Sequence, residues 1–202
     1  MKIGLIVECG PQGAEVQVLP ILVGKLPGNH DVDIVTMDNK PKLISECGKV
    51  ASQLLANGCR RVLVLWDLYP AWRQKGEKPC RKEDRDGILA SLREEKVVMA
   101  KVGLVCVEEE LESWLIADGR ALQAMFSSAQ HPARRIPDQK RPDKVQKPKT
   151  RLTKLFQQHG KGYYNDLIHA AQIAERLPDL KRVRRSPSFA RFAARLQIRG
   201  GS

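Results

Sequence analysis

The sequence predicts an α/β protein whose sheet is mostly parallel. Short apolar segments alternate with segments whose apolar residues recur at helical spacing, in the order strand, helix, strand, helix, strand. The segment from Arg61 to Tyr69 (R-V-L-V-L-W-D-L-Y) has five consecutive apolar residues before Asp67, which is typical of a strand buried on both faces. Because this alternation requires right-handed crossovers, it favours a parallel sheet.

The first half of the chain contains the elements of this alternation. Residues 2–8 (K-I-G-L-I-V-E) form a short apolar segment, and we expect a strand there. Helical spacing predicts a helix over 14–25, alternation predicts a strand over 32–37, and helical spacing predicts a second helix over 41–57. The apolar segment that ends at Asp67 then follows as the next strand.

Beyond that strand the pattern continues with further helices and one more strand region. We expect a helix near 86–95, and residues 97–107 to form the next strand or a broken pair of strands. Acidic residues gather at 108–112, where the dipole of a following helix favours them. We expect that helix to continue to Phe126, with Gly119 only interrupting it.

The last third of the chain differs in composition. Residues 127–149 contain four prolines, many cations and no apolar periodicity, which predicts a basic, proline-rich linker or loop. Three helical patterns follow, over 150–158, 164–176 and 188–198, the last opened by Ser186-Pro187. The expected organisation has three parts: an α/β domain over 1–126, the linker over 127–149 and a basic helical extension over 150–202.

Composition argues against several protein classes. No apolar stretch approaches the roughly 18 residues that a membrane span needs, and no cleavable leader pattern follows Met1. We therefore expect a soluble, cytoplasmic protein that has no membrane partner. The five cysteines are an odd number without a C-x-x-C pair, which argues against a disulfide framework and a zinc ribbon. We expect them to be reduced thiols, largely buried.

Positive charge is concentrated in the C-terminal part of the chain. Residues 1–126 carry 17 Lys and Arg against 18 Asp and Glu, whereas residues 127–202 carry 18 against 5. This asymmetry is typical of a chain that binds nucleic acid or another polyanion; the alternative is a solvated loop that contacts an acidic protein partner. The candidate phosphate contacts form two clusters, Arg134, Arg135, Lys140, Arg141, Lys144, Lys147 and Lys149, and Lys181, Arg182, Arg184 and Arg185. Because no base-reading module is visible, we expect sequence-tolerant contacts with the backbone of DNA or RNA.

Three carboxylates are candidates for a metal or catalytic site. Glu8, Asp67 and Glu112 each lie at or just after the end of a different predicted strand, and a parallel sheet brings such ends to one edge. Clustered carboxylates repel one another unless a cation lies between them, and their oxygens suit Mg²⁺ or Mn²⁺. Such a cation would polarise a phosphoryl oxygen or activate water. The alternative is three separate structural acids, at a strand end, in a turn and in the first turn of a helix.

Several short motifs resemble one known family along nearly the whole chain. They are Val7-Glu8 followed by a glycine turn, the strand that ends in Asp67, E-L-E-S-W-L-I-A-D over 110–118, Pro148-Lys149, Tyr163-Tyr164 and S-P-S-F-A-R-F over 186–192. In order and spacing they are similar to a Toprim-related bacterial family identified only as domain of unknown function forty-two seventy-six. That family is distantly similar to the overcoming-lysogenisation-defect nucleases.

The resemblance implies a Toprim-like, Rossmann-like fold and a Mg²⁺-dependent nuclease, a hydrolase that acts on nucleic acid. In Toprim proteins the glutamate after the first strand, which corresponds to Glu8, is a general acid or base. A D-x-D motif after a later strand binds Mg²⁺, and Asp67 corresponds to its first residue. The resemblance also implies an AAA or ABC-type ATPase partner and a role in antiviral defence.

One position departs from that motif. The D-x-D reads D-L-Y over 67–69, and the phenol of Tyr69 cannot be an anionic ligand at neutral pH because its ordinary pKa is about 10. Either Glu112 or the acids Asp84 and Asp86 supply the missing ligand, or catalysis has been lost; Asp84 and Asp86 are alternatively helix-start residues. Two functions therefore stay open: a Mg²⁺-dependent nuclease or phosphoryl-transfer subunit, and a non-catalytic nucleic-acid-binding or regulatory subunit of an ATPase complex.

Overall fold

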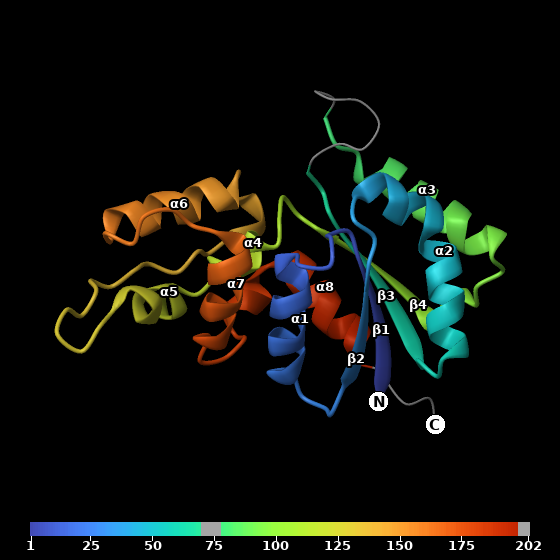
Figure 1. Cartoon of the computed structure of the whole chain (residues 1–202), viewed down its shortest axis with the longest axis horizontal. Coiled ribbons are helices and arrows are strands. Elements are labelled where there is room, and N and C mark those ends of the chain that lie inside the picture. Colours follow the sequence, from blue (N-terminus) through green and yellow to red (C-terminus); the bar gives the residue numbers. More distant parts are fainter. Residues whose placement is uncertain (70–77, 198–202) are drawn as a thin grey trace. The chain divides into compact units, whose positions relative to one another are not determined.

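Four parallel strands form one sheet in the computed structural model, which describes residues 1–69 and 78–197 (Figure 1). The strands are β1 (Lys2–Val7), β2 (Asp31–Thr36), β3 (Arg61–Asp67) and β4 (Val102–Val107). Their order in the sheet is β2-β1-β3-β4, and every pair of neighbours is parallel. The predicted α/β fold with a parallel sheet is confirmed, and β1 and β3 are its central strands.

Helices connect the strands and make up most of the remaining chain. The α-helices are α1 (Ala14–Gly24), α2 (Lys40–Ala56), α3 (Arg81–Glu94), α4 (Glu112–Leu115), α5 (Gly119–Phe126), α6 (Pro148–Gln158), α7 (Asp166–Glu175) and α8 (Pro187–Leu196). The 3-10 helices are η1 (Met99–Lys101), η2 (Pro142–Lys144) and η3 (Val183–Arg185).

The chain divides into two compact units. The first unit contains residues 1–12, residues 27–107 and the end of the chain from Arg191. It therefore holds the sheet, α2, α3 and the last part of α8. The second unit contains residues 13–26 and 108–190, and therefore α1, α4 to α7 and the beginning of α8.

In the first unit, α2 and α3 lie together on one face of the sheet (Figure 1). Alternate residues of β3, among them Val64 and Trp66, join residues of both helices in one apolar core. The helices approach closely at Gly48, whose N–H donates to the Oγ atom of Ser91 at 3.0 Å. A Cβ atom at Gly48 would lie 2.1 Å from the carbonyl oxygen of Ser91, so this crossing requires glycine.

The second unit is built around buried aromatic residues. Trp114 of α4 packs edge-on against Phe189 of α8, with ring centroids 5.1 Å apart. The indole Nε1–H of Trp114 donates to the Oγ atom of Ser188 at 2.7 Å. Phe126 of α5 packs edge-on against Phe156 of α6, with centroids 5.0 Å apart. The C-terminal helices are therefore part of the core of this unit.

Helix boundaries differ from the sequence pattern at two places. α3 begins at Arg81, before the expected start at residue 86, because its polar first turn lacks the apolar spacing that marks a helix in the sequence. The expected helix through Gly119 is instead two helices. The side chain of Asp118 accepts a hydrogen bond from the N–H of Arg120 at 2.9 Å and so caps the start of α5. A Cβ atom at Gly119 would lie 2.0 Å from the carbonyl oxygen of Ile136, so glycine allows this close approach.

The five cysteines are free thiols. Cys47, Cys59 and Cys106 are buried, Cys9 is half-buried and Cys80 is exposed. Within the described residues, every helix is too short or too polar to cross a membrane.

Candidate functional site

Glu8 and Asp67 lie beside each other at the carboxyl ends of the two central strands. The register of β1 against β3 pairs Val7 with Leu65, so both strands end at the same edge of the sheet. The Glu8 carboxylate accepts a hydrogen bond from the backbone N–H of Asp67, with an Oε2 to N distance of 3.1 Å. Both residues are half-buried. This edge therefore presents two acidic side chains from adjacent strands.

Glu112 belongs to the second unit and is buried there, with 1% of its surface exposed. The hydroxyl of Tyr164 donates to its Oε1 atom at 3.1 Å, and the Nζ atom of Lys149 lies 3.9 Å from the same oxygen. Burial raises the pKa of Glu112 to about 7, although the positive charge of Lys149 and the Tyr164 hydrogen bond oppose the rise. Glu112 therefore exchanges a proton near neutral pH.

Lys149, a candidate phosphate contact that is half-buried, also contacts the Glu112 carboxylate. Its Nζ atom lies 3.0 Å from Oδ2 of Asp166 and 3.9 Å from Oε1 of Glu112. Burial tends to lower the pKa of Lys149, but the two carboxylates outweigh it and raise the pKa. The partners Tyr164 and Asp166 were not identified as site residues from the sequence, because their separation from Glu112 along the chain conceals the contact. The Tyr163-Tyr164 motif is the one sequence feature that pointed to this segment.

Asp84 and Asp86 both lie on α3 and are held by partners other than a metal site. The carboxylate of Asp84 accepts a hydrogen bond from Nε1 of Trp66 at 3.1 Å and lies 3.9 Å from Nζ of Lys40. Burial raises the pKa of Asp84, and the positive charge of Lys40 opposes this rise. Asp86 is exposed and forms an ion pair with Lys82 at 3.3 Å. The Asp84 carboxylate therefore orients the indole ring of Trp66 in the core.

In the described parts of the chain, the acidic residues do not form a complete metal-binding site. Across residues 1–69 and 78–197, no group of three or more His, Cys, Asp or Glu side chains is arranged to hold a metal ion. Mg²⁺, however, is commonly held by one or two carboxylates, while water and substrate phosphates complete its shell. The pair formed by Glu8 and Asp67 fits a cation that arrives together with a phosphate substrate.

Most residues of the two basic clusters are exposed. In the first cluster these are Arg134, Arg135, Lys140, Arg141, Lys144 and Lys147, and in the second Lys181, Arg184 and Arg185. Arg182 is half-buried: its guanidinium group contacts the carboxylate of Asp138, and its Nε atom lies 3.9 Å from Oδ1 of Asp118. Arg182 therefore helps hold the second cluster against the segment that carries the first.

The two basic clusters meet around one pocket of the second unit. This basic pocket has a volume of about 800 Å³, and its described lining residues are Arg135, Pro137, Asp138, Lys140 and Arg185. The carboxylate of Asp138 lies 3.4 Å from Nη1 of Arg185 as well as in contact with Arg182. Asp138 therefore fixes the side chains of Arg182 and Arg185. The cations that line the opening are Arg135, Lys140 and Arg185.

Comparison with known proteins identifies a family. A family model described as "Domain of unknown function (DUF4276)" matches residues 17–197. Comparisons with curated proteins and with solved structures gave no match. The matched region includes Asp67, Glu112 and both basic clusters, and it begins after Glu8.

Proposed function

The chain belongs to the DUF4276 family, a domain of unknown function, and we propose from its residues that it binds the phosphate backbone of nucleic acid. The observation that carries this proposal is the basic pocket of the second unit. There Arg135 and Lys140, from the irregular segment before α6, meet Arg185 of η3 around one opening.

The chemistry of these side chains suits phosphate groups. The planar guanidinium group of arginine donates two parallel hydrogen bonds to phosphate oxygens, and the ammonium group of lysine is a compact point charge beside it. Each phosphate that a cation neutralises releases counterions, so binding weakens as the salt concentration rises. The cations come from turns and irregular chain rather than from one face of a long helix, which favours contacts with the backbone over base recognition.

Neutralising the basic pocket tests this function. The variant Arg135→Ala/Lys140→Ala/Arg185→Ala removes its three cations. The control Arg151→Ala/Lys154→Ala/Arg176→Ala removes the same number and types of charge from exposed positions of the same unit that do not line the pocket.

Both variants are titrated against labelled DNA and RNA of mixed sequence by fluorescence anisotropy, at several salt concentrations. Loss of three phosphate contacts should reduce the salt slope of the association constant by about 3 and weaken binding of all sequences alike. The control should keep a slope close to that of the wild-type protein. Equal binding by the two variants would contradict the proposal.

A second candidate function is phosphoryl transfer that depends on a divalent cation. The adjacency of Glu8 and Asp67 at the carboxyl ends of β1 and β3 favours it. Mg²⁺ or Mn²⁺, when bound, polarises a phosphoryl oxygen or activates water. In this function Asp67 provides a ligand oxygen, and Glu8 accepts or gives a proton while it holds the amide of Asp67. The Toprim relationship implied by the short motifs belongs to this second candidate.

Substitutions at the two acids separate catalysis from binding. Glu8→Gln and Asp67→Asn should each abolish cation-dependent cleavage of nucleic acid and leave the affinity for an oligonucleotide close to that of the wild-type protein. Asp31→Asn is the control, since Asp31 is exposed at the opposite end of the sheet, where β2 begins. Cleavage that survives both substitutions would exclude this mechanism. An ATPase partner and a role in antiviral defence stay predictions. Copurification of this chain with an ATPase encoded by a neighbouring gene tests the first of them.

A further inference from the structure

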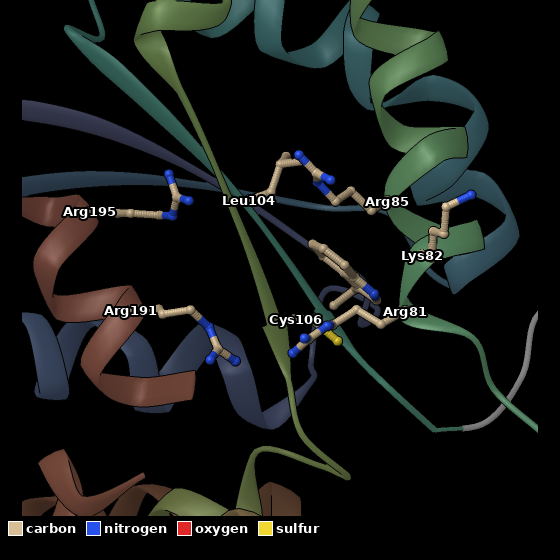
Figure 2. Close-up of a pocket in the computed structure, with 8 residues that line it drawn as sticks. Arg81, Lys82, Arg85, Leu104, Cys106, Arg191 and Arg195 are labelled. Atoms are coloured by element: carbon tan, nitrogen blue, oxygen red, sulfur yellow. The ribbon is translucent and has the colours of Figure 1, made fainter. Parts of the chain in front are cut away.

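A second cationic pocket lies in the first unit, along β4, which is an edge strand of the sheet. This β4 pocket has a volume of about 430 Å³ (Figure 2). Its described lining residues are Trp66, Arg81, Lys82, Arg85, Leu104, Cys106, Arg191 and Arg195. They include five cations and no acid, and they share no member with the basic pocket of the second unit.

Four arginines reach the β4 pocket from two helices. Arg81 and Arg85 are one turn apart on α3, and Arg191 and Arg195 are one turn apart on α8, so each pair shares a helix face. Figure 2 shows Arg81 and Arg85 extending from α3, and Arg191 extending from α8, toward the strand between them. The stem of Arg195 lies against β4: a Cβ atom at Gly103 would be 3.0 Å from its Cδ atom.

Arg195 of the β4 pocket lies among other positive charges. Burial lowers the pKa of Arg195, and the positive charges of Arg61, Arg191 and Arg85 lower it further. The Nε atom of Arg61 is buried without a hydrogen-bond partner among the described residues. Such a concentration of like charge costs free energy in the isolated fold, and a bound anion offsets that cost.

The floor of the β4 pocket indicates what kind of anion fits. Trp66 is buried, and its indole N–H donates a hydrogen bond to Asp84. Its ring therefore offers no exposed face on which a base would stack. Leu104 and Cys106 add no charged group. The guanidinium groups are therefore the groups that would bind the anion, and their paired N–H donors match phosphate oxygens. Arginines one helix turn apart have Cβ atoms about 5–6 Å apart, so each helix presents two neighbouring guanidinium groups, which favours a ligand with adjacent phosphate groups.

We propose that the β4 pocket is a phosphate-binding site that holds two or more adjacent phosphate groups through Arg81, Arg85, Arg191 and Arg195. The phosphates come either from a nucleic-acid strand or from a free polyphosphate. In the first case the site adds a contact to the nucleic-acid binding proposed above and rests on that function. In the second case it is a separate site.

Calorimetry with the full chain tests the β4 pocket, with inorganic pyrophosphate as one probe and an oligonucleotide as the other. Arg85→Ala removes an exposed guanidinium group, and Arg195→Met removes a charge while it keeps an apolar stem against Gly103. Arg93→Ala is the control, because Arg93 is exposed on the same helix as Arg85 and does not line the pocket.

Each pocket substitution should weaken pyrophosphate binding about tenfold, which corresponds to about 1.4 kcal/mol, and the control should leave it unchanged. If the oligonucleotide affinity falls in parallel, the phosphates are those of a strand. If pyrophosphate binding alone falls, the ligand is a free polyphosphate.

Two outcomes would overturn the proposal: no pyrophosphate binding to the wild-type protein, or wild-type affinity for both probes in both pocket variants. In either case oligonucleotide binding that depends on Arg135, Lys140 and Arg185 would still support the proposed function, so the two failures are distinguishable.

Discussion

The stability of the Glu112→Gln variant should depend less on pH than that of the wild-type protein. Burial raises the pKa of Glu112 from its ordinary value of 4.5 to about 7. Between these values the folded protein keeps a proton that the unfolded chain releases, so the free energy of unfolding falls as the pH rises through this window. At about 1.4 kcal/mol for each pH unit, the loss amounts to about 3 kcal/mol by pH 8. Glutamine does not titrate, and its side-chain oxygen still accepts the Tyr164 hydroxyl hydrogen bond.

Urea unfolding between about pH 5 and pH 8 measures this difference. Across that range the free energy of unfolding of Glu112→Gln relative to the wild-type protein should rise by about 3 kcal/mol. Glu175→Gln is the control, because Glu175 is exposed at the end of α7 in the same unit. It should keep the pH dependence of the wild-type protein. Parallel curves for the wild-type protein and Glu112→Gln would refute the argument from burial.

Two further substitutions test the packing of each unit by urea unfolding. Gly48→Ala should destabilise the first unit by about 1–3 kcal/mol or more, because its Cβ atom would lie 2.1 Å from the Ser91 carbonyl oxygen. Gly24→Ala, whose Cβ atom meets nothing within 4 Å, should be neutral or slightly stabilising, and equal losses at the two glycines would contradict the close crossing of α2 and α3. Ser188→Ala should cost about 1–3 kcal/mol because it leaves the buried indole N–H of Trp114 without its acceptor. A stability unchanged by Ser188→Ala would show that this hydrogen bond contributes nothing.

The parallel sheet was predictable because its two central strands are buried on both faces. In β3 the residues from Val62 to Trp66 have no polar position, and a short apolar segment bounded by turn residues is typical of a strand buried on both faces. β1 follows the same logic at the amino-terminal end of the chain, whereas the edge strand β2 was predictable from its alternation of polar and apolar residues. Once helices separate these strands, the handedness of crossovers leaves few other topologies.

Helix starts that depend on polar side chains were harder to predict. Asp118 caps α5 through a hydrogen bond with the residue two positions later, and Gly119 follows it at a close approach to Ile136. The sequence shows an apolar stripe that continues through both positions, so it favours one helix. The contact with Ile136 comes from a distant segment, and periodicity contains no information about it.

The candidate sites divide in the same way. The adjacency of Glu8 and Asp67 follows from parallel strands that end together, which the sequence pattern contains. The β4 pocket does not, because Arg85 and Arg195 are far apart in the sequence and meet only through the packing of α3 and α8 about an edge strand. The composition gives the number of cations, but the fold determines which of them lie close together.

The salt dependence of oligonucleotide binding by the wild-type protein tests the central claim most directly. Three cations line the basic pocket, so with duplex DNA the logarithm of the association constant should fall linearly with the logarithm of salt concentration, with a slope of about −3 or steeper. Duplexes of unrelated sequence should give the same slope and similar affinity. An affinity that does not change with salt, or no binding at low salt, would contradict recognition of the phosphate backbone by this chain.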